Sequence, residues 1–387
     1  MTYINRELES KLIAMAQGFP VVSINGPRQS GKSTLVQHAF PDYTYISLED
    51  IDRRERANDD PRGFLSLYGE RLIIDEAQYA PDLFSYIQTR VDEVNRPGMY
   101  VLSGSQNFLM MKEIGQSLAG RVSVQTLLPF SYSEIKDSEF KPETTCQWLM
   151  NGGYPRAIVG RLAPTDFYDG YLQTYLERDI RNETSVRDIA KFHNFLQACA
   201  ARVGAPINLS DVGRGIGADQ RTVSAWLSML EESYIVFRLA PYYRSIANRH
   251  TKTAKLYFYD TGLLCSLLEI ESAAHLRQSS YYGAVFENAI IAEVFKRKFH
   301  AGRRPSAFFW RNPKNKDTEI DLILESSERL SLYEIKASET ANRRHLDSFN
   351  KIELDTQKQT TRSIIYDGET LGDYLGVRFI NWRDLAE

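Results

Sequence analysis

Eight consecutive residues constrain the fold of this chain more than any other feature. Residues 26–33 have the sequence GPRQSGKS, which fits the pattern G-x-x-x-x-G-K-[ST] in full. The apolar stretch VVSIN precedes them, and the helical pattern STLVQHAF begins at their end. A glycine-rich loop between a strand and a helix allows backbone amides to curl around phosphate groups. The sequence therefore predicts a phosphate-binding loop inside an α/β domain.

The loop pattern assigns a chemical role to its polar groups. Lys32 is expected to neutralise the β- and γ-phosphates of a nucleotide, and the hydroxyl of Ser33 is expected to bind Mg²⁺. We therefore predict ATP and Mg²⁺ as cofactors. The residues expected to contact ATP are Gly26, Pro27, Arg28, Gln29, Ser30, Gly31, Lys32, Ser33 and Thr34.

A second apolar strand, RLIIDE, ends in two carboxylates. Asp75 is expected to hold the Mg²⁺ shell, and Glu76 to orient or deprotonate the attacking water. The next strand, MYVLSGSQ, ends in polar residues at the place of a γ-phosphate sensor. The sensor candidates are Ser103, Ser105 and Gln106, although small polar residues also end ordinary strands.

Arg121, in the segment SLAGR, stands immediately before the fifth predicted strand. An arginine at this place could reach the γ-phosphate of a neighbouring subunit as an arginine finger, which would require a homo-oligomer. The alternative is an ordinary surface arginine in a salt bridge. The sequence does not distinguish these two roles for Arg121.

The segments GPRQSGKST, LIIDE, LSGS and SLAGR occur in this order and resemble the AAA superfamily of P-loop ATPases. More narrowly, they are similar to a bacterial and archaeal group of AAA ATPases that carry a C-terminal domain of unknown function. The resemblance is most specific in residues 20–130. It implies the sheet order 5-1-4-3-2 and a helical lid after residue 130. It also places LERDI (Leu176–Ile180) in that lid, where Arg178 could act as a second sensor.

The hydrophobic pattern predicts an α/β protein of several domains, as a length of 387 residues also favours. Short apolar strands alternate with helical patterns in the first part, which is typical of a largely parallel sheet. The predicted domains are an AAA P-loop ATPase core (1–130), a helical lid (131–205), a winged helix-turn-helix (206–280) and a small α/β domain that resembles nucleases (281–387).

Residues 209–230 have the rhythm of a helix-turn-helix, with the turn at 217–219 and a second helix whose apolar face carries Trp226. The stretches 233–242 and 255–259 are expected to form a wing hairpin. Residues 233–259 contain five Lys or Arg and no Asp or Glu, so this element could contact DNA phosphates. Winged helices also serve as protein-binding modules, which is the alternative.

Four charged residues of the last domain form a recognisable series. Glu287 lies on the apolar stripe of a predicted helix, Asp321 lies inside the strand EIDLIL, and Glu334 and Lys336 lie two apart on LYEIKAS. The series resembles the PD-(D/E)xK restriction-endonuclease-like fold. The resemblance implies that Asp321 and Glu334 bind Mg²⁺ with help from Glu287, while Lys336 positions or activates water. The alternative is a degenerate fold in which these residues form structural ion pairs.

Composition excludes several other classes of protein. The formal net charge of −3 gives no global basic field, so any DNA surface must be local, for example residues 296–316 with eight Lys or Arg and no acid. The three cysteines lack ligand spacing, so neither a disulfide framework nor a zinc site is expected. No apolar run of about 18 residues predicts a membrane span. With charges in MTYINRELES, we expect a cytoplasmic protein.

Three functions are compatible with these features. The first is an ATPase that couples ATP hydrolysis to DNA engagement by its C-terminal half. The second is an ATP-regulated nuclease with an active carboxylate site. The third is a nucleotide-gated switch that binds a protein partner and does not cleave DNA.

Overall fold

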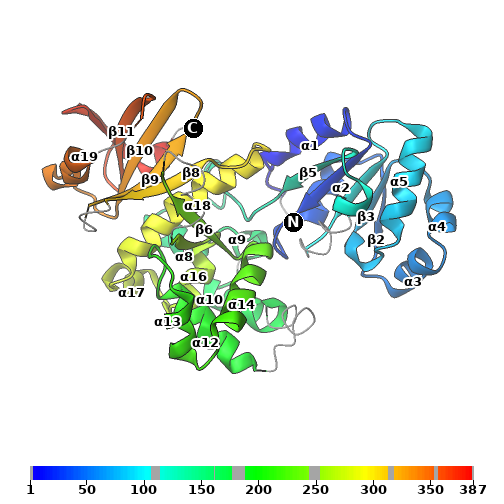
Figure 1. The fold of residues 1–387 in the computed structure, drawn as a ribbon, viewed down its shortest axis with the longest axis horizontal. Coiled ribbons are helices and arrows are strands. Elements are labelled where there is room, and N and C mark those ends of the chain that lie inside the picture. The colour runs from blue at the N-terminus through cyan, green and yellow to red at the C-terminus, as the bar shows by residue number, and fades with distance from the viewer. Residues whose placement is uncertain are drawn as a thin grey trace.

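The computed structural model describes residues 3–105, 114–160, 162–176, 188–243, 253–312, 318–352 and 356–385. Two of the predicted sensors, Gln106 and Arg178, lie outside the described residues. The N-terminal sheet and its helices lie at one end of the molecule and the C-terminal sheet at the other, with helices from the middle of the chain between and below them (Figure 1).

The N-terminal sheet is parallel, and its strands lie in the order β2-β3-β4-β1-β5, which confirms the order implied by the resemblance. The central strands β1, β3 and β4 are buried along their whole length, as expected for strands covered by helices on both faces. The strands are β1 (Val21–Asn25), β2 (Thr44–Ser47), β3 (Leu72–Asp75), β4 (Tyr100–Ser103) and β5 (Val122–Thr126). The helices are α1 (Leu8–Ala16), α2 (Lys32–Ala39), α3 (Ile51–Asp59), α4 (Pro61–Tyr68) and α5 (Leu83–Val94).

A helical segment follows β5, as predicted for residues after 130. Its aromatic side chains pack into one large core, in which Tyr154, Tyr168 and Phe192 are almost fully buried. The same core includes the last long helix of the chain, so the helical segment and the C-terminal part share their apolar interior. The helices are α7 (Tyr132–Ile135), α8 (Thr145–Asn151), α9 (Pro155–Val159), α10 (Pro164–Tyr171) and α12 (Ile189–Ala200).

Helices α13 (Leu209–Ile216) and α14 (Gln220–Glu232) occupy the segment predicted to be a helix-turn-helix. Asp219 caps α14 by accepting a hydrogen bond of 2.9 Å from Thr222 N. Trp226 packs against Phe192 and Phe195 at ring distances of 5.4 and 5.5 Å, so its indole belongs to the core.

The hairpin that follows α14 is part of a larger sheet. Strands β6 (Val236–Pro241) and β7 (Lys255–Phe258) are antiparallel, and the end of β6 pairs in parallel with β8. A free-standing wing would leave the outer edge of β6 unpaired, whereas here β8 (Ala307–Arg311) occupies part of it. The sheet therefore continues across the domain boundary predicted at residue 280.

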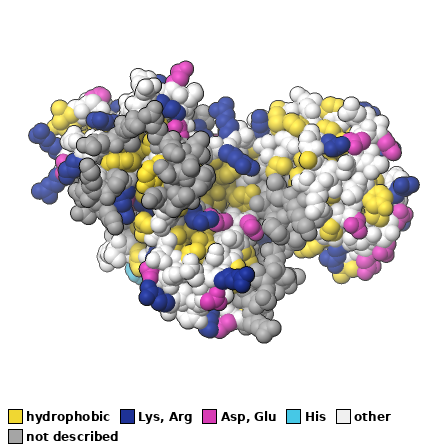
Figure 2. Space-filling model, in the orientation of Figure 1, with side chains coloured by type: hydrophobic (Ala, Val, Ile, Leu, Met, Phe, Trp, Pro, Cys, Tyr) yellow, Lys and Arg dark blue, Asp and Glu magenta, His cyan; other side chains and the backbone are white. Residues whose placement is uncertain are grey.

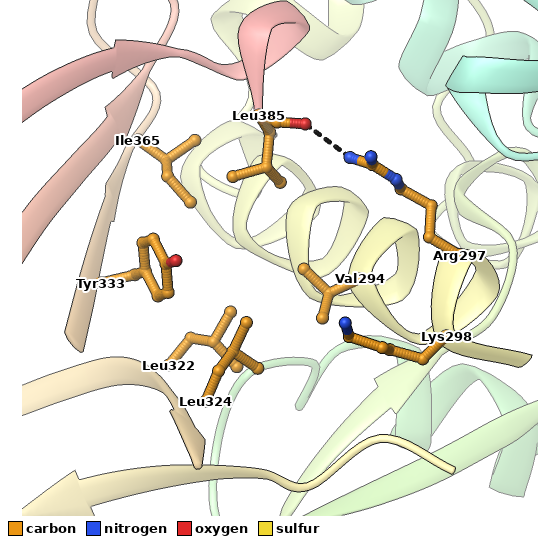
Figure 3. Close-up of a pocket in the computed structure, with 8 residues that line it drawn as sticks. All are labelled: Val294, Arg297, Lys298, Leu322, Leu324, Tyr333, Ile365 and Leu385. Atoms are coloured by element: carbon orange, nitrogen blue, oxygen red, sulfur yellow. Dashed lines mark hydrogen bonds between the residues drawn. The ribbon is translucent and has the colours of Figure 1, made fainter. Parts of the chain in front are cut away.

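The second sheet has the order β12-β13-β11-β10-β9-β8-β6-β7. Helix α18 (Tyr282–His300) lies on one of its faces. Figure 3 shows Val294 of α18 facing Leu322, Leu324 and Tyr333 of the sheet across a cavity of about 30 Å³. The remaining elements are α16 (Thr261–Leu267), α17 (Ala273–Gln278), β9 (Glu319–Glu325), β10 (Arg329–Lys336), α19 (Asp347–Lys351), β11 (Gln359–Tyr366), β12 (Leu371–Tyr374) and β13 (Val377–Asn381). Within the described ranges, no helix has both the length and the apolar character that crossing a membrane requires.

Candidate nucleotide site and carboxylate cluster

The loop between β1 and α2 requires glycine at two positions. Gly26 has a φ of 150°, and a Cβ atom there would lie 2.0 Å from the carbonyl oxygen of Leu127. Gly31, which caps α2, has a φ of 93°. Residues other than glycine rarely adopt such φ angles, so the backbone conformation explains both glycines of the motif.

Lys32 is the first residue of α2, and its side chain turns back over the loop. Its Nζ donates hydrogen bonds to the carbonyl oxygens of Gly26 at 2.9 Å and Pro27 at 2.8 Å. Only 6% of the residue is exposed. Burial lowers the pKa of Lys32 to about 8, although Glu76 and Asp75 favour its charged form. A phosphate anion bound in the loop would stabilise the protonated, charged form of Lys32, which burial disfavours.

Asp75, at the end of β3, lies directly beside α2. Its Oδ2 accepts hydrogen bonds from the hydroxyls of Ser33 at 2.7 Å and Tyr45 at 2.5 Å. Ser103 donates to Oδ1 of the same carboxylate. A serine hydroxyl beside a carboxylate is the pair of oxygen ligands that Mg²⁺ takes in P-loop sites. The residues present therefore fit the predicted metal. Sequence analysis missed Tyr45, which lies on β2, the strand that pairs with β3.

Glu76 has a φ of 53°, which is unusual for a residue other than glycine. Its Oε2 accepts hydrogen bonds from Ser105 Oγ at 3.0 Å and from Gln78 Nε2 at 2.5 Å. Of the sensor candidates, Ser103 therefore binds Asp75 and Ser105 binds Glu76. Both serines fix the carboxylates from which the predicted chemistry would proceed.

A cavity of about 780 Å³ opens over the loop. It is lined by loop residues and Glu76, together with residues from the N-terminal segment and from α9. This volume lies within the range of about 300–1,000 Å³ that is typical of small-molecule sites. The lining includes two arginines, Arg6 and Arg156, that sequence analysis did not single out.

Arg121 lies at the other end of the sheet from the loop. Strands β1 and β5 are parallel, with Val21 opposite Val122, so Arg121 precedes the amino ends while the loop follows the carboxyl end of β1. Its guanidinium forms a two-point ion pair with Asp92, with distances of 2.5 and 2.8 Å. Arg121 therefore sits in a surface ion pair in the single chain, and its action on a neighbouring subunit remains a prediction.

A second polar cluster lies on the C-terminal sheet and contains all four residues of the nuclease-like series. Oδ2 of Asp321 accepts a hydrogen bond of 2.8 Å from Ile335 N and lies 3.5 Å from Lys336 Nζ. The same Nζ lies 2.5 Å from Oε2 of Glu334. Asp321 and Glu334 thus approach one ammonium group.

Glu287 extends into this cluster from α18. Its Oε1 accepts hydrogen bonds from Tyr257 OH at 2.6 Å and from Lys255 Nζ at 3.2 Å. Burial, and then the charge of Asp321, raise the pKa of Glu287 to about 7 and that of Glu334 to about 8. In the ranges that the structure describes, no group of three or more His, Cys, Asp and Glu side chains has the arrangement of a metal site.

Several basic side chains of the two stretches 233–259 and 296–316 contact other parts of the protein. Arg238 pairs with Glu231, and Lys255 is buried, while Arg244, Arg249 and Lys252 lie outside the described residues. In residues 296–316, three basic side chains bind internal partners: Lys296 bonds Phe130 O, Arg297 bonds Leu385 O and Arg311 bonds Glu319. Figure 2 shows acidic and basic side chains interspersed on the visible face.

One face of α18 joins the two halves of the molecule. Glu293 accepts hydrogen bonds of 2.8 and 3.0 Å from Tyr132 N, and Lys296 donates one of 3.1 Å to Phe130 O. His300 Nε2 accepts one of 3.2 Å from Leu128 N. These three residues are spaced by three and four, so they share one side of the helix and bind successive parts of the segment after β5.

Three family models match successive parts of the chain. Residues 18–136 match a model described as an AAA domain. Residues 142–274 and 282–383 match models described as domains of unknown function (DUF8612 and DUF4143). The first of these two spans the boundary predicted at residue 205.

Proteins that match nearly the whole chain in the sequence comparison include two from different organisms. "Uncharacterized protein Rv2008c" of Mycobacterium tuberculosis is 29% identical over 370 residues, which cover 94% of this chain and 80% of that protein. "Uncharacterized protein MJ1544" of Methanocaldococcus jannaschii is 22% identical over 401 residues, which cover 95% and 86%.

Similar solved structures include the Walker-type ATPase PABY2304 of Pyrococcus abyssi, with a TM-score of 0.46, 14% identity and coverage of 68% of this chain and 96% of that one. AMPPCP-bound DnaA from Aquifex aeolicus has a TM-score of 0.32 and 15% identity, with coverage of 58% and 86%. The matched model, the parallel sheet order and the loop geometry together show that residues 18–136 form an AAA-type P-loop ATPase domain.

Proposed function

We propose that this chain is a Mg²⁺-dependent ATPase that passes its nucleotide state to its C-terminal half. One observation carries the first part: Lys32, Ser33, Asp75 and Glu76 meet at one end of a parallel sheet, beside a cavity of nucleotide size. Phosphoryl transfer needs positioning and charge neutralisation more than covalent chemistry from the protein. These four residues supply both.

Each side chain has a separate task in this proposal. The ammonium group of Lys32 exchanges the carbonyl oxygens of Gly26 and Pro27 for phosphate oxygens. Ser33 and Asp75 hold Mg²⁺, which neutralises charge on the phosphates when it is bound. Glu76, held through one oxygen by Ser105 and Gln78, orients the attacking water and accepts its proton.

We also assign a phosphate-binding role to Arg156. It lies on α9 (Pro155–Val159) and lines the same cavity as the loop. An arginine from the helical segment would add a positive charge to those that Arg28 and Lys32 of the loop bring to the cavity. In this proposal Arg156 takes the role of second sensor that the sequence suggested for Arg178.

The second part of the proposal rests on a buried chain of contacts from the loop to α18. Arg6 donates to Ser30 O at 2.8 Å and to Glu134 Oε1 at 2.9 Å. His300 Nδ1 lies 3.3 Å from Glu134 Oε2. Burial alone would raise the pKa of Glu134, but Arg6 and His300 hold it well below its usual range.

Helix α18 extends this connection to the carboxylate cluster. It carries His300 at its carboxyl end and Glu287 thirteen residues earlier, a separation of about 20 Å along a helix. A rigid helix bound at both ends would move the cluster when the loop changes its contacts with Arg6. We therefore propose α18 as the element that transmits the nucleotide state.

Nucleic acid is the partner that we propose for the C-terminal half. Arg303 and Arg304 are exposed beyond the end of α18, and they are basic residues available for phosphate contacts. The observation that favours the second candidate, an ATP-regulated nuclease, is the convergence of Glu287, Asp321, Glu334 and Lys336. A protein partner for the α13–α14 region is the third candidate.

The test compares ATP hydrolysis by the full chain with and without duplex DNA, and measures DNA integrity in Mg²⁺ or Mn²⁺. The proposal expects ATP turnover that DNA changes. DNA binding that weakens as salt rises would separate nucleic-acid engagement from a protein-binding switch. Turnover that is absent in all conditions would refute the ATPase assignment.

A further inference from the structure

Lys255 occupies an unusual place for a lysine. It begins β7, only 2% of it is exposed, and its Nζ lies 3.2 Å from Glu287 Oε1. The same ammonium group forms an ion pair with Glu319. Burial of an unpaired ammonium group is strongly unfavourable, so these two carboxylates are what keep Lys255 inside the protein.

The carboxylate cluster already contains its own cations. Glu287 and Glu319 pair with Lys255, and Glu319 also pairs with Arg311 at 2.6 Å. Asp321 and Glu334 share Lys336. Four carboxylates thus meet three fixed positive groups, and each carboxylate has at least one of them as a partner.

A divalent metal at this place would have to bind the same carboxylates. Mg²⁺ binds oxygen ligands at about 2.0–2.1 Å, and an ammonium group can only donate hydrogen bonds, so it cannot join the ligand shell. The carboxylates as placed therefore do not fit a metal ion while Lys255 is among them. This differs from the metal site that the nuclease-like series implies.

Lys255 is held in place by the backbone around it. β7 pairs with β6, and Pro206 forms an additional bridge to Lys255 on the other side. Gly204 N donates a hydrogen bond of 2.9 Å to Leu256 O. Because β6 flanks it on one side and the segment at Gly204 and Pro206 on the other, Lys255 cannot leave the cluster by the swing of a free wing.

We propose that Lys255 is the resident cation of this cluster and that it excludes divalent metal from the C-terminal site. The cluster then serves as a fixed ion-pair network that fastens α18 to β7, β9 and β10. In this arrangement the described part of the C-terminal sheet has no metal-dependent nuclease centre. The inference is independent of the ATPase activity, because it concerns only residues of the C-terminal sheet and α18.

The test measures Mn²⁺ binding to the nucleotide-free full chain by electron paramagnetic resonance. We expect no Mn²⁺ site that depends on Asp321 in the unaltered chain, at Mn²⁺ concentrations up to about the millimolar affinities of weak protein sites. Lys255→Met should gain one Mn²⁺ per chain, at least tenfold tighter than any binding by the unaltered chain. Lys255→Met combined with Asp321→Asn should lose it again. Lys255→Arg, which keeps the charge, should gain nothing.

Lys358→Met is the matched control, since Lys358 pairs with Glu325 at 2.9 Å on the same sheet but outside the cluster. It should leave Mn²⁺ binding unchanged. The proposal would be overturned if the unaltered chain bound Mn²⁺ and Asp321→Asn abolished that binding, because the cluster would then hold metal with Lys255 in place. Equal Mn²⁺ binding by the Met and Arg variants would overturn it as well, because charge would then not be the cause. Failure of folded Lys255→Met to gain Mn²⁺, with folding checked by circular dichroism, would also contradict it.

Discussion

Arg6 donates a hydrogen bond of 2.8 Å to the carbonyl oxygen of Ser30, within the phosphate-binding loop. The same guanidinium contacts Leu128 O at 2.7 Å and lies 3.5 Å from His300 Nε2. A residue near the start of the chain therefore links the nucleotide loop to the end of α18. If the loop changed conformation and moved the Ser30 carbonyl, Arg6 would transmit that movement to His300 on α18.

The first prediction concerns His300. His300→Ala removes the acceptor for Leu128 N–H and one partner of Glu134, so we expect the free energy of unfolding to fall by about 1–3 kcal/mol. Nucleotide affinity should also fall, because the Arg6 contact to the loop loses its support. His275→Ala, at an exposed position on α17, is the control and should change neither. Unchanged nucleotide affinity in folded His300→Ala would separate α18 from the nucleotide site.

A second prediction concerns pH. Lys32 has a pKa lowered to about 8 by burial, so the nucleotide-free protein loses this charge as pH rises through about 8. Phosphate binding favours the charged form, which means that binding above this pH requires uptake of a proton. The affinity for a fluorescent ATP analogue should therefore be constant from pH 6.5 to 7.5 and fall by up to about tenfold per unit well above pH 8. Lys32→Arg stays charged and should show no such fall near pH 8.

The third prediction tests the backbone of the loop. Gly26→Ala would place its Cβ 2.0 Å from Leu127 O at a φ of 150°, so the loop must shift. We expect a loss of stability of at least about 2 kcal/mol and a loss of nucleotide binding. Gly115→Ala, where nothing lies within 4 Å of the new Cβ, is the control and should leave both unchanged. A Gly26→Ala protein with normal ATP affinity would show that this geometry is dispensable.

Arg121 gives a fourth prediction. If it acts on the site of a neighbouring subunit, Arg121→Ala and Lys32→Ala should each be inactive alone and recover part of the ATPase activity when mixed. The physical reason is that a mixed interface combines an intact loop from one chain with an intact arginine from the other. Full activity of Arg121→Ala in a strictly monomeric protein would leave only the observed ion pair with Asp92.

The N-terminal domain was predictable because its signals are local. The motif at residues 26–33 fixes a strand, a turn and a helix within one segment, and the predicted strand VVSIN coincides with β1 (Val21–Asn25). Asp75 and Glu76 were also predictable, because the carboxyl ends of parallel strands meet at one edge. The contacts of Ser103 and Ser105 with these two carboxylates required the structure.

The residues that sequence analysis missed depend on distant contacts. Lys255 appeared to be one of several basic residues on a wing, whereas the pairing of β6 with β8 places it among carboxylates 32 and 64 positions further along the chain. No local pattern marks Arg6 or His300, since Glu134 lies 128 positions from Arg6 and Leu128 lies 172 positions from His300.

The pairing of β8 with β9 is irregular at Asp321. The register between β8 and β9 shifts between Phe308 and Trp310, which are paired with Ile323 and Ile320. One residue of β8 therefore lies opposite two of β9, and Asp321 is one of the two. Such a bulge redirects a side chain, and simple alternation along the strand does not predict it.

The central claim is that Lys32 and Glu76 carry ATP hydrolysis, and one comparison tests it most directly. Steady-state ATP turnover and affinity for a fluorescent ATP analogue are measured for the unaltered chain, Lys32→Ala and Glu76→Gln. The account predicts that Lys32→Ala loses nucleotide binding, whereas Glu76→Gln keeps binding and loses most of its turnover, by at least about a hundredfold. Turnover at the unaltered rate in Glu76→Gln, or unchanged affinity in Lys32→Ala, would contradict it.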